Sequence, residues 1–372
     1  MQKLIQEIGV FAAPVEDLSM DSQQTPALHP LELSIHRLRT PWGGWPDGAG
    51  EIRILSGPPL ESLVLNGALA GRRLTELVAR HSFQLLGNDM ELDSREPFPL
   101  RLRFLCTSRD LPVTVHPNDG FTLARQLPMV GQEKVFYILK AGRDGRLYFG
   151  LKEAVSRTRF FNAVSMGEVR NLLHGIHPRP GQVFTVPPGR PYALGAGISL
   201  FEIARHTDAA FRLVRSLKGS DSDDLWDILE QGPVNPEPIP SLSCPVGQSR
   251  IDYLCVTPRF AIRRFSVVQS LDLSLSGSRF RVYTALQGSG WLHWGISNTY
   301  CPLHPFQAVL VPAVPEDIAL ESAAGMVVLE VSMPNLAGGA LDDVEIPGVS
   351  PAAVASLGGT DYGHILREYL GR

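Results

Sequence analysis

Residues 111–138 read LPVTVHPNDGFTLARQLPMVGQEKVFYI, and the fold is interpreted outward from this stretch. Its first part alternates as a strand does, the polar run at residues 117–120 breaks it, and a second strand begins at Lys134. His116 ends the first strand, and Glu133 precedes the second. Imidazole nitrogen and carboxylate oxygen both bind divalent metals, so one hypothesis is a metal ion held between two strands. The alternative is that His116 caps a strand end and Glu133 is a solvated turn residue.

The composition indicates a soluble globular protein with a mainly β fold. Of the 372 residues, 44% are hydrophobic and 19% are charged, which provides ample material for a core. A chain of this length predicts two or three domains. The 35 glycines and 30 prolines fall between short apolar runs, a pattern typical of an all-β plan with many turns. The net charge of −4 gives no basic footprint for nucleic acid.

The cysteines and the N-terminal segment indicate a cytoplasmic protein. The four cysteines have no CxxC spacing, so we expect reduced, mostly buried thiols and no disulfide framework or zinc knuckle. Glu7 interrupts the apolar residues at the start of the chain, and the apolar run after it is too short for a signal peptide. No segment approaches the ~18 apolar residues of a membrane helix, so no membrane partner is expected.

The pattern along the chain predicts two β domains. Residues 1–30 are predicted to form a loosely held extension. Residues 31–231 are predicted to form a first, site-bearing domain with a helical insertion. Residues 232–246, which begin GPVNPEPIPSLSCP, predict a proline-rich linker without packed structure. Residues 247–372 contain short β runs such as DYLCV and GMVVLEV, which predict a second, smaller barrel or sandwich closed by a helix.

Helices are predicted at three places before the linker. One begins near Gly71, where leucines and a valine share a face. A second begins after Ser165, because Ser165 and Glu168 have the spacing of a capping box before VRNLLHG. The third covers residues 223–230. In the strand that starts at Phe98, Arg103 faces the same side as the arginine two residues before it.

Several motifs, in the same order along the chain, resemble the type I mannose-6-phosphate isomerases. The run FPLRLRFLCTSRDLPVTVHPND, residues 98–119, is similar to the family's strand that leads into a Val-His-Pro-Asp turn. The other matching features are Trp42-Gly-Gly44, the Gly-x-x-Leu-x-x-Leu run from Gly71, Leu86-Gly87, the Val-Pro-Pro-Gly turn that ends at Gly189, and Asp208-Ala-Ala-Phe-Arg212. The resemblance extends from about Trp42 to Arg212 and continues more weakly through the second β domain.

This resemblance implies a double cupin, with two cupin-type β-barrel or jelly-roll domains and a helical insertion. It also implies a zinc site in the first domain. The family's ligands are the His of the turn, a Glu on the next strand, a second His and often a Gln; the corresponding positions here are His116, Glu133, Tyr192 and Thr114. A phenol must lose its proton to bind a metal well, so zinc or another divalent metal is expected to bind with weakened affinity. His206 or His177 substitutes only if the barrel wall brings it to the ion.

The reaction implied by the resemblance is the interconversion of mannose 6-phosphate and fructose 6-phosphate through a cis-enediol. In such a reaction cationic side chains balance the developing enediolate. Arg212 matches the family's arginine in this role, and Arg103 matches a pocket lysine. A guanidinium cannot shuttle a proton as a lysine can. Glu202 matches a family Glu and is expected to orient a partner.

Two hypotheses therefore remain from the sequence. One is a metal-dependent sugar-phosphate isomerase. The other is a degenerate cupin that binds a phosphosugar or a protein partner without turnover, because Tyr192, Thr114 and Arg103 all depart from the family pattern. His293 and His304 in the second β domain have no carboxylate at ligand spacing in the sequence, so that domain is interpreted as structural. The sequence leaves the oligomeric state open.

Overall fold

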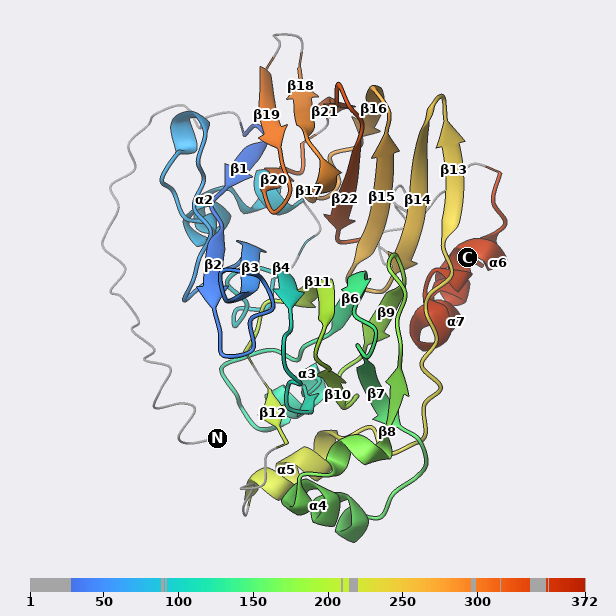
Figure 1. Ribbon diagram of the computed structural model, residues 1–372. Helices are drawn as coiled ribbons and strands as arrows, with labels where there is room; N and C mark the ends of the chain where they lie inside the picture. The colour runs from blue at the N-terminus through green and yellow to red at the C-terminus, as the bar shows by residue number, and fades with distance from the viewer. Residues whose placement is uncertain are drawn as a thin grey trace, which may run out of the picture.

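The computed structural model describes residues 28–87, 90, 92–208, 210–213, 220–295, 299–314, 316–334, 346 and 348–371. Most of the predicted N-terminal extension lies outside these residues. The described chain forms four antiparallel sheets, which pair into two barrels with short helices at their edges (Figure 1). The mainly β fold with two barrels and a helical insertion is confirmed.

The first barrel encloses an apolar interior between a six-stranded and a five-stranded sheet. The six-stranded sheet has the order β2-β3-β4-β11-β6-β9, and the five-stranded sheet has the order β12-β5-β10-β7-β8. The strands are β2 His36–Arg39, β3 Ala49–Leu55, β4 Leu100–Cys106, β5 Thr114–Val115, β6 Lys134–Ala141, β7 Leu147–Leu151, β8 Leu173–Ile176, β9 Val183–Val186, β10 Tyr192–Leu194, β11 Ile198–Arg205 and β12 Phe211–Arg212. Phe136, Phe149 and Leu200 help to fill the space between the two sheets.

The second barrel follows the same plan with a seven-stranded and a four-stranded sheet. Their orders are β1-β20-β17-β22-β15-β14-β13 and β16-β21-β18-β19. The strands are β1 Leu31–Leu33, β13 Leu242–Val246, β14 Ser249–Val256, β15 Ala261–Val267, β16 Ser270–Leu275, β17 Arg281–Gly288, β18 Gly290–Trp294, β19 Thr299–Leu303, β20 Ala308–Val311, β21 Glu316–Glu321 and β22 Met326–Ser332. The four cysteines are unpaired, as predicted, and Cys255 and Cys301 are buried.

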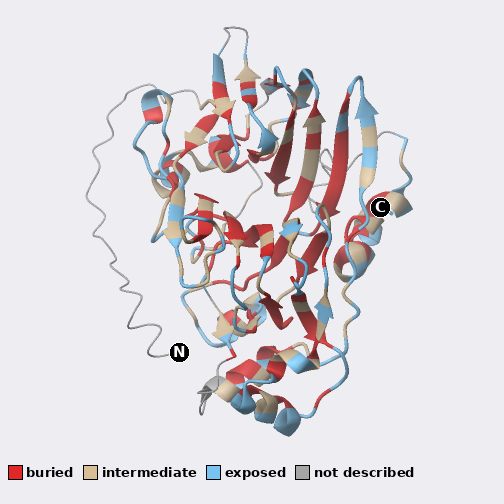
Figure 2. Cartoon of the chain, viewed as in Figure 1, coloured by how far each residue is buried: buried red, intermediate tan, exposed pale blue. Residues whose placement is uncertain are grey.

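The two barrels share one apolar core where the six-stranded sheet packs on the seven-stranded sheet. Successive residues of a strand point to opposite faces. The outer face of the six-stranded sheet therefore presents Phe104 and Phe201, which cluster with Phe280 and Leu310 of the second barrel. The strands on both sides of this contact are largely buried (Figure 2). The inner face of the same sheet is left to line the first barrel.

The helices cover the outside of the barrels. They are η1 Gly67–Leu69, α2 Leu74–Leu86, α3 Asp119–Ala124, α4 Arg157–Met166, η2 Val169–Leu172, α5 Ser220–Ile228, α6 Pro351–Ser356 and α7 Gly359–Leu370. α4 and α5 pack on the outer face of the five-stranded sheet, where Phe160 and Leu225 meet Val115 (Figure 1). Among the described residues, no helix has both the length and the apolar character that crossing a membrane requires.

The predicted domain boundaries need two corrections. β1 was assigned to the first domain, but it pairs with β20 of the second barrel, with Leu31 opposite Leu310. The predicted linker is also shorter than residues 232–246, because Leu242–Val246 is strand β13 and pairs with β14. Pro245 is tolerated there because β13 is the edge strand of its sheet.

Two local predictions also differ from the structure. The helix predicted after Ser165 is only the short 3-10 helix η2, which is followed by strand β8. The α-helix of this region, α4, lies before it, and Ser156 caps α4 by accepting a hydrogen bond from the backbone of Arg159. Gly167, in the left-handed conformation, ends that helix. The break at residues 117–120 leads into helix α3, because the Asn118 side chain accepts a hydrogen bond from the Phe121 backbone.

Candidate functional site in the first barrel

Arg103 and Glu202 meet inside the first barrel. They lie directly opposite each other on β4 and β11, and Arg103 Nε is 2.6 Å from Glu202 Oε1. Phe201 and Ile203 point into the core between the barrels, so Glu202 faces the barrel interior. A second contact places Arg103 Nη1 3.0 Å from Glu51 on β3. The two predicted residues are therefore brought together.

Lys134 joins this ion cluster, although sequence reasoning did not select it. Its Nζ lies 3.1 Å from Glu202 Oε2, and its side chain is only 2% exposed. The Glu202 side chain is 1% exposed. The pair is sealed from water and from any ligand that does not displace a wall of the barrel.

Charge and burial compete at this pair. Burial opposes ionisation of Glu202, but Arg103 and then Lys134 outweigh it and hold the pKa of Glu202 well below its usual value. Burial lowers the pKa of Lys134 to about 7, against the pull of Glu202. The carboxylate is thus the firmly charged member of the cluster, and Arg103 is its permanent counter-ion.

His116 and Tyr192 form a second pair on the five-stranded sheet. His116 Nε2 lies 3.0 Å from the Tyr192 hydroxyl, and the two rings stack with centroids 5.7 Å apart. Lys134 Nζ lies 5.5 Å from the centre of the Tyr192 ring. Burial and then Glu202 raise the pKa of the Tyr192 phenol, so this phenol keeps its proton at neutral pH.

Glu133 is not brought to His116, which corrects the predicted pairing. On β6, Lys134 shares the inner face with Phe136 and Ile138, whereas Glu133 has the parity of Val135 and Tyr137 in the core between the barrels. Glu133 lies beside Thr257 and Tyr362, and burial raises the pKa of its carboxyl. The strand places a lysine, not a carboxylate, inside the barrel.

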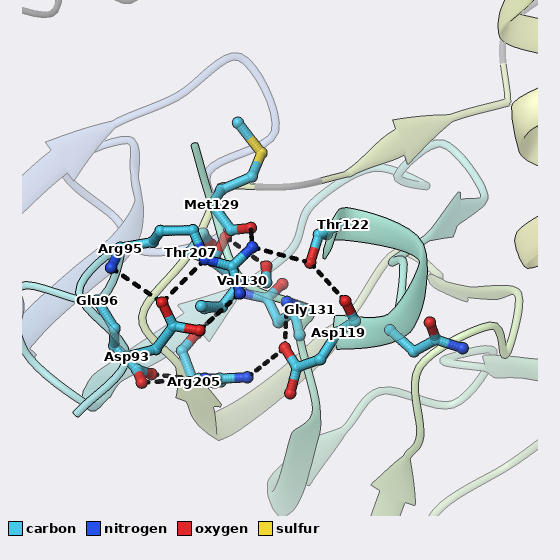
Figure 3. A network of polar contacts seen from close by, with 12 residues as sticks. Asp93, Arg95, Glu96, Asp119, Thr122, Met129, Val130, Gly131, Arg205 and Thr207 are labelled. Carbon is cyan, nitrogen blue, oxygen red and sulfur yellow. Dashed lines mark hydrogen bonds and ion pairs between the residues drawn. The ribbon is translucent and has the colours of Figure 1, made fainter. Parts of the chain in front are cut away.

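A polar network fixes this parity at the start of β6 (Figure 3). Arg205 at the end of β11 binds Glu96 at 2.7 Å and Asp119 at 2.6 Å. Asp119 accepts a hydrogen bond from the Gly131 backbone at 2.8 Å. The backbone before Lys134 is therefore anchored, so β6 cannot slip by one residue to turn Glu133 inward without breaking these contacts.

Thr114 and Arg212 lie on β5 and β12, at one edge of the five-stranded sheet, which we call the barrel mouth. Thr114 on β5 is paired with Tyr192 on one side and with Arg212 on the other. Directly opposite residues of antiparallel strands share a face, so Thr114 and Arg212 face the same way as Tyr192. Thr114 Oγ1 donates a hydrogen bond to the Pro112 carbonyl, at 3.2 Å. Arg212 is exposed, and within the described part of the chain it has no ion-pair partner.

More cations than carboxylates line this part of the barrel. Arg53 lies directly opposite Arg103 in the sheet. Arg101 is also on the inner face and binds Asp208 at 2.7 Å, while its Nε is buried without a hydrogen-bond partner among the described residues. Arg101, Arg53 and Lys134 were missed from the sequence. The alternation of the run LRLRFL already indicated that Arg101 and Arg103 share a face.

The other histidines do not complete a metal site. The Pro58 carbonyl lies 3.0 Å from His206 Nε2, and burial followed by Arg101 lowers the pKa of His206 to about 4. His177 Nδ1 lies 2.8 Å from the Gly145 carbonyl. Across the residues that the structure describes, no three His, Cys, Asp or Glu side chains lie close enough to bind a metal.

The donors present do not fit the implied zinc ion. Its ligands would have to be a neutral imidazole and deprotonated oxygen donors. His116 instead contacts a protonated phenol, and the nearby carboxylate, Glu202, is already bound by Arg103 and Lys134. A divalent cation placed there would face the permanent charge of Arg103 and compete with the Lys134 amine for Glu202.

The second barrel holds a buried ion cluster of its own. Glu330 on β22 receives both Arg263 Nε at 2.7 Å and Arg263 Nη2 at 2.8 Å. Arg281 Nη1 lies 3.1 Å away, and the Tyr283 hydroxyl donates at 2.6 Å. No carboxylate has ligand spacing to His293 in the sequence, but folding brings its Nε2 to 3.2 Å from Glu321 of the neighbouring strand β21.

The two joined barrels have the fold of a solved mannose 6-phosphate isomerase. The crystal structure of the mannose 6-phosphate isomerase from Bacillus subtilis matches with a TM-score of 0.71 at 22% identity, over 82% of this chain and 99% of that chain. This likeness establishes the fold.

The sequence comparisons point to the same family. The chain is 27% identical to mannose-6-phosphate isomerase ManA of Bacillus subtilis (strain 168) over 282 residues, covering 72% of this chain and 84% of that protein. It is 30% identical over 165 residues to the mannose-6-phosphate isomerase of Streptococcus mutans, covering 44% of this chain and 50% of that protein. No family model matches. The chain is therefore related in sequence and fold to the type I mannose-6-phosphate isomerases.

Proposed function

We propose that the first barrel binds a phosphorylated sugar at its cationic mouth and does not carry out metal-assisted isomerisation. The observation that supports this most directly is the position of Lys134, 3.1 Å from Glu202 inside the barrel, while Glu133 has the opposite parity on the same strand. The predicted imidazole–carboxylate pair is therefore not assembled at this site.

The charge at the barrel mouth supports a phosphorylated ligand. Arg212 is exposed and faces the side of Tyr192, while Arg53 and Arg103, both paired with Glu51, add positive charge on the neighbouring sheet. Guanidinium groups match phosphate oxygens in geometry and charge, and they remain protonated at every physiological pH. The relatives named mannose-6-phosphate isomerases make a hexose phosphate the first ligand to test.

Calorimetric titration with mannose 6-phosphate, fructose 6-phosphate, mannose and inorganic phosphate tests the proposal. We expect the two sugar phosphates to bind in a 1:1 ratio and mannose not to bind. Arg212→Ala should weaken binding about tenfold or more, because a charge-assisted contact is lost. Arg143→Ala is the matched control, since Arg143 is an exposed arginine in the turn between β6 and β7. Equal effects of the two substitutions would remove the barrel mouth as the binding site.

A second candidate is the isomerisation of mannose 6-phosphate and fructose 6-phosphate. It is favoured by the relatives' names and because both Arg212 and Glu202 are present at the positions expected from the resemblance. Arg212 would balance the charge of an enediolate. Against it, Glu202 and Lys134 are sealed at 1% and 2% exposure, so neither reaches a sugar carbon in this arrangement. A coupled assay for fructose 6-phosphate, with zinc, cobalt or manganese added, decides between the two. Turnover that disappears in both His116→Ala and Arg212→Ala would establish the isomerase.

A further inference from the structure

The two barrels carry the same kind of buried ion cluster at corresponding places. β11 lies between β4 and β6 in the first barrel, and β22 lies between β15 and β17 in the second. Each of these strands belongs to the sheet that packs on the other barrel, and each carries one buried inward glutamate, Glu202 or Glu330. Both flanking strands supply the partners of that glutamate in each case.

The second cluster shows what neutralises such a glutamate without a metal. Glu330 lies directly opposite both Arg263 and Tyr283, and it binds Arg263, Arg281 and the Tyr283 hydroxyl. All of these groups are fixed protein side chains. A fully buried carboxylate needs this degree of compensation, because an unpaired charge in a barrel interior is strongly unfavourable.

The first cluster is built in the same way, with a lysine in place of the second arginine. Glu202 receives Arg103 from β4 at 2.6 Å and Lys134 from β6 at 3.1 Å. Tyr192 lies beside the cluster, with its ring 5.5 Å from Lys134 Nζ and its hydroxyl turned to His116. The carboxylate is thereby neutralised from both flanking strands.

We propose that the Lys134 ammonium takes the place of a divalent ion in the first barrel. The Glu202 cluster is then a permanent structural plug, like the Glu330 cluster. The ammonium both holds Glu202 and excludes a second cation from the space between Glu202 and the His116–Tyr192 pair. This inference does not depend on which ligand binds at the barrel mouth.

The proposal predicts that a metal site forms when Lys134 is replaced by a carboxylate and Tyr192 by an imidazole. In the Lys134→Glu/Tyr192→His variant, Glu202 no longer meets an ammonium, and two imidazoles and an added carboxylate surround the vacated space. These are the ligand types that zinc prefers. Zinc bound per chain is measured by dialysis against zinc chloride, followed by mass spectrometry of the metal. We expect stoichiometric zinc in the double variant and none in the wild-type chain.

Matched variants show whether the presence of Lys134 is what prevents zinc from binding. Glu133→Gln/Tyr192→His keeps Lys134 and should hold no zinc. Lys134→Met should also hold no zinc, and it should lower the midpoint of urea unfolding because the Glu202 plug loses a cation. Arg263→Met should lower the midpoint in the same way, since it opens the equivalent plug.

Several outcomes would overturn the proposal. These are stoichiometric zinc in the wild-type chain that is lost in His116→Ala, zinc in the variants that keep Lys134, or a folded double variant without zinc. If the double variant does not fold, the urea midpoints of Lys134→Met and Arg263→Met decide. An unchanged midpoint in Lys134→Met, beside a lowered one in Arg263→Met, rejects the plug.

Discussion

Glu202 keeps a negative charge where water does not reach it, and its two cations make this possible. Arg103 and Lys134 hold the carboxylate from opposite sides at 2.6 and 3.1 Å. Removing the negative charge would leave Lys134 buried without its counter-ion and Arg103 with Glu51 alone. Such losses are larger than the net contribution of an intact buried ion pair, because an uncompensated charge remains.

We therefore expect Glu202→Gln to lower the free energy of unfolding by about 3–5 kcal/mol. Glu133→Gln should lower it by less, because burial raises the pKa of Glu133, whereas the cations around Glu202 lower its pKa and stabilise its charged form. Urea unfolding at pH 7 measures both. Comparable losses in the two variants would mean that Glu133 bears as much buried charge as Glu202, contrary to this account.

Glu330 makes the free energy of unfolding depend on pH in the acidic range. Burial opposes its ionisation, but Arg263 and Arg281 outweigh burial and lower the pKa of Glu330 to about 2, from an ordinary value of 4.5. A lowered pKa contributes stability that is complete above pH 4.5 and is lost as pH falls through about 2. The contribution is roughly 3 kcal/mol.

The difference in unfolding free energy between the wild-type chain and Glu330→Gln should therefore shrink as pH falls from about 5 toward 2. Unfolding in urea at pH 5.5, 4 and 3 measures this difference. A gap that stays constant across these pH values would show that the carboxylate of Glu330 does not titrate as its surroundings require.

The strand pattern alone does not show whether Lys134 or Glu133 points into the barrel. In EKVFYI, Lys134 alternates with Phe136 and an isoleucine, while Glu133 alternates with Val135 and Tyr137. Both faces of β6 are apolar because one lines a barrel and the other packs on the second barrel, so apolar periodicity alone does not tell inside from outside. The choice between Glu133 and Lys134 required the tertiary contact of the two sheets.

The helices show a similar division between what local pattern predicts and what packing decides. α2 was predicted from apolar periodicity, and Leu74–Leu86 lies where the pattern placed it. α4 was not predicted, because Ser165 and Glu168 have capping-box spacing but Gly167 ends α4 between them, and only the short helix η2 follows. The effective cap, Ser156, precedes a stretch with weak apolar periodicity.

The position of the cap can be tested directly. Ser156→Ala should destabilise the protein by about 1 kcal/mol, because the Arg159 backbone N–H loses its acceptor. Ser165→Ala should change stability by a few tenths of a kcal/mol at most, since Ser165 Oγ donates to the Asn162 carbonyl near the end of the helix. Thermal unfolding of both variants measures this. A larger loss for Ser165→Ala would restore the cap predicted from the sequence.

Across the whole molecule, the apolar contact between the barrels makes them one cooperative unit. Phe98 and Phe280 come from different barrels, and their ring centroids lie 5.7 Å apart. The sequence predicted two barrels but not this shared core, because an apolar strand face does not indicate which sheet it will contact.

Phe280→Ala should lower the free energy of unfolding by about 3–5 kcal/mol while leaving a single transition, because both barrels lose the same support. Phe83→Ala, at a position 68% exposed, is the control and should have little effect. Denaturation followed by tryptophan fluorescence and by circular dichroism measures the transition. Two separated transitions in the wild-type chain would contradict a shared core.

Strand β1 has a consequence for how the chain can be divided. It precedes the first barrel in the sequence but pairs with β20, so the second barrel includes a strand from the N-terminal side of the first. A protease that cuts the exposed segment near Asn235 would leave two fragments that travel together under native conditions and part only in denaturant. For the same reason, the ribosome must release nearly the entire chain before its earliest strand finds its partner.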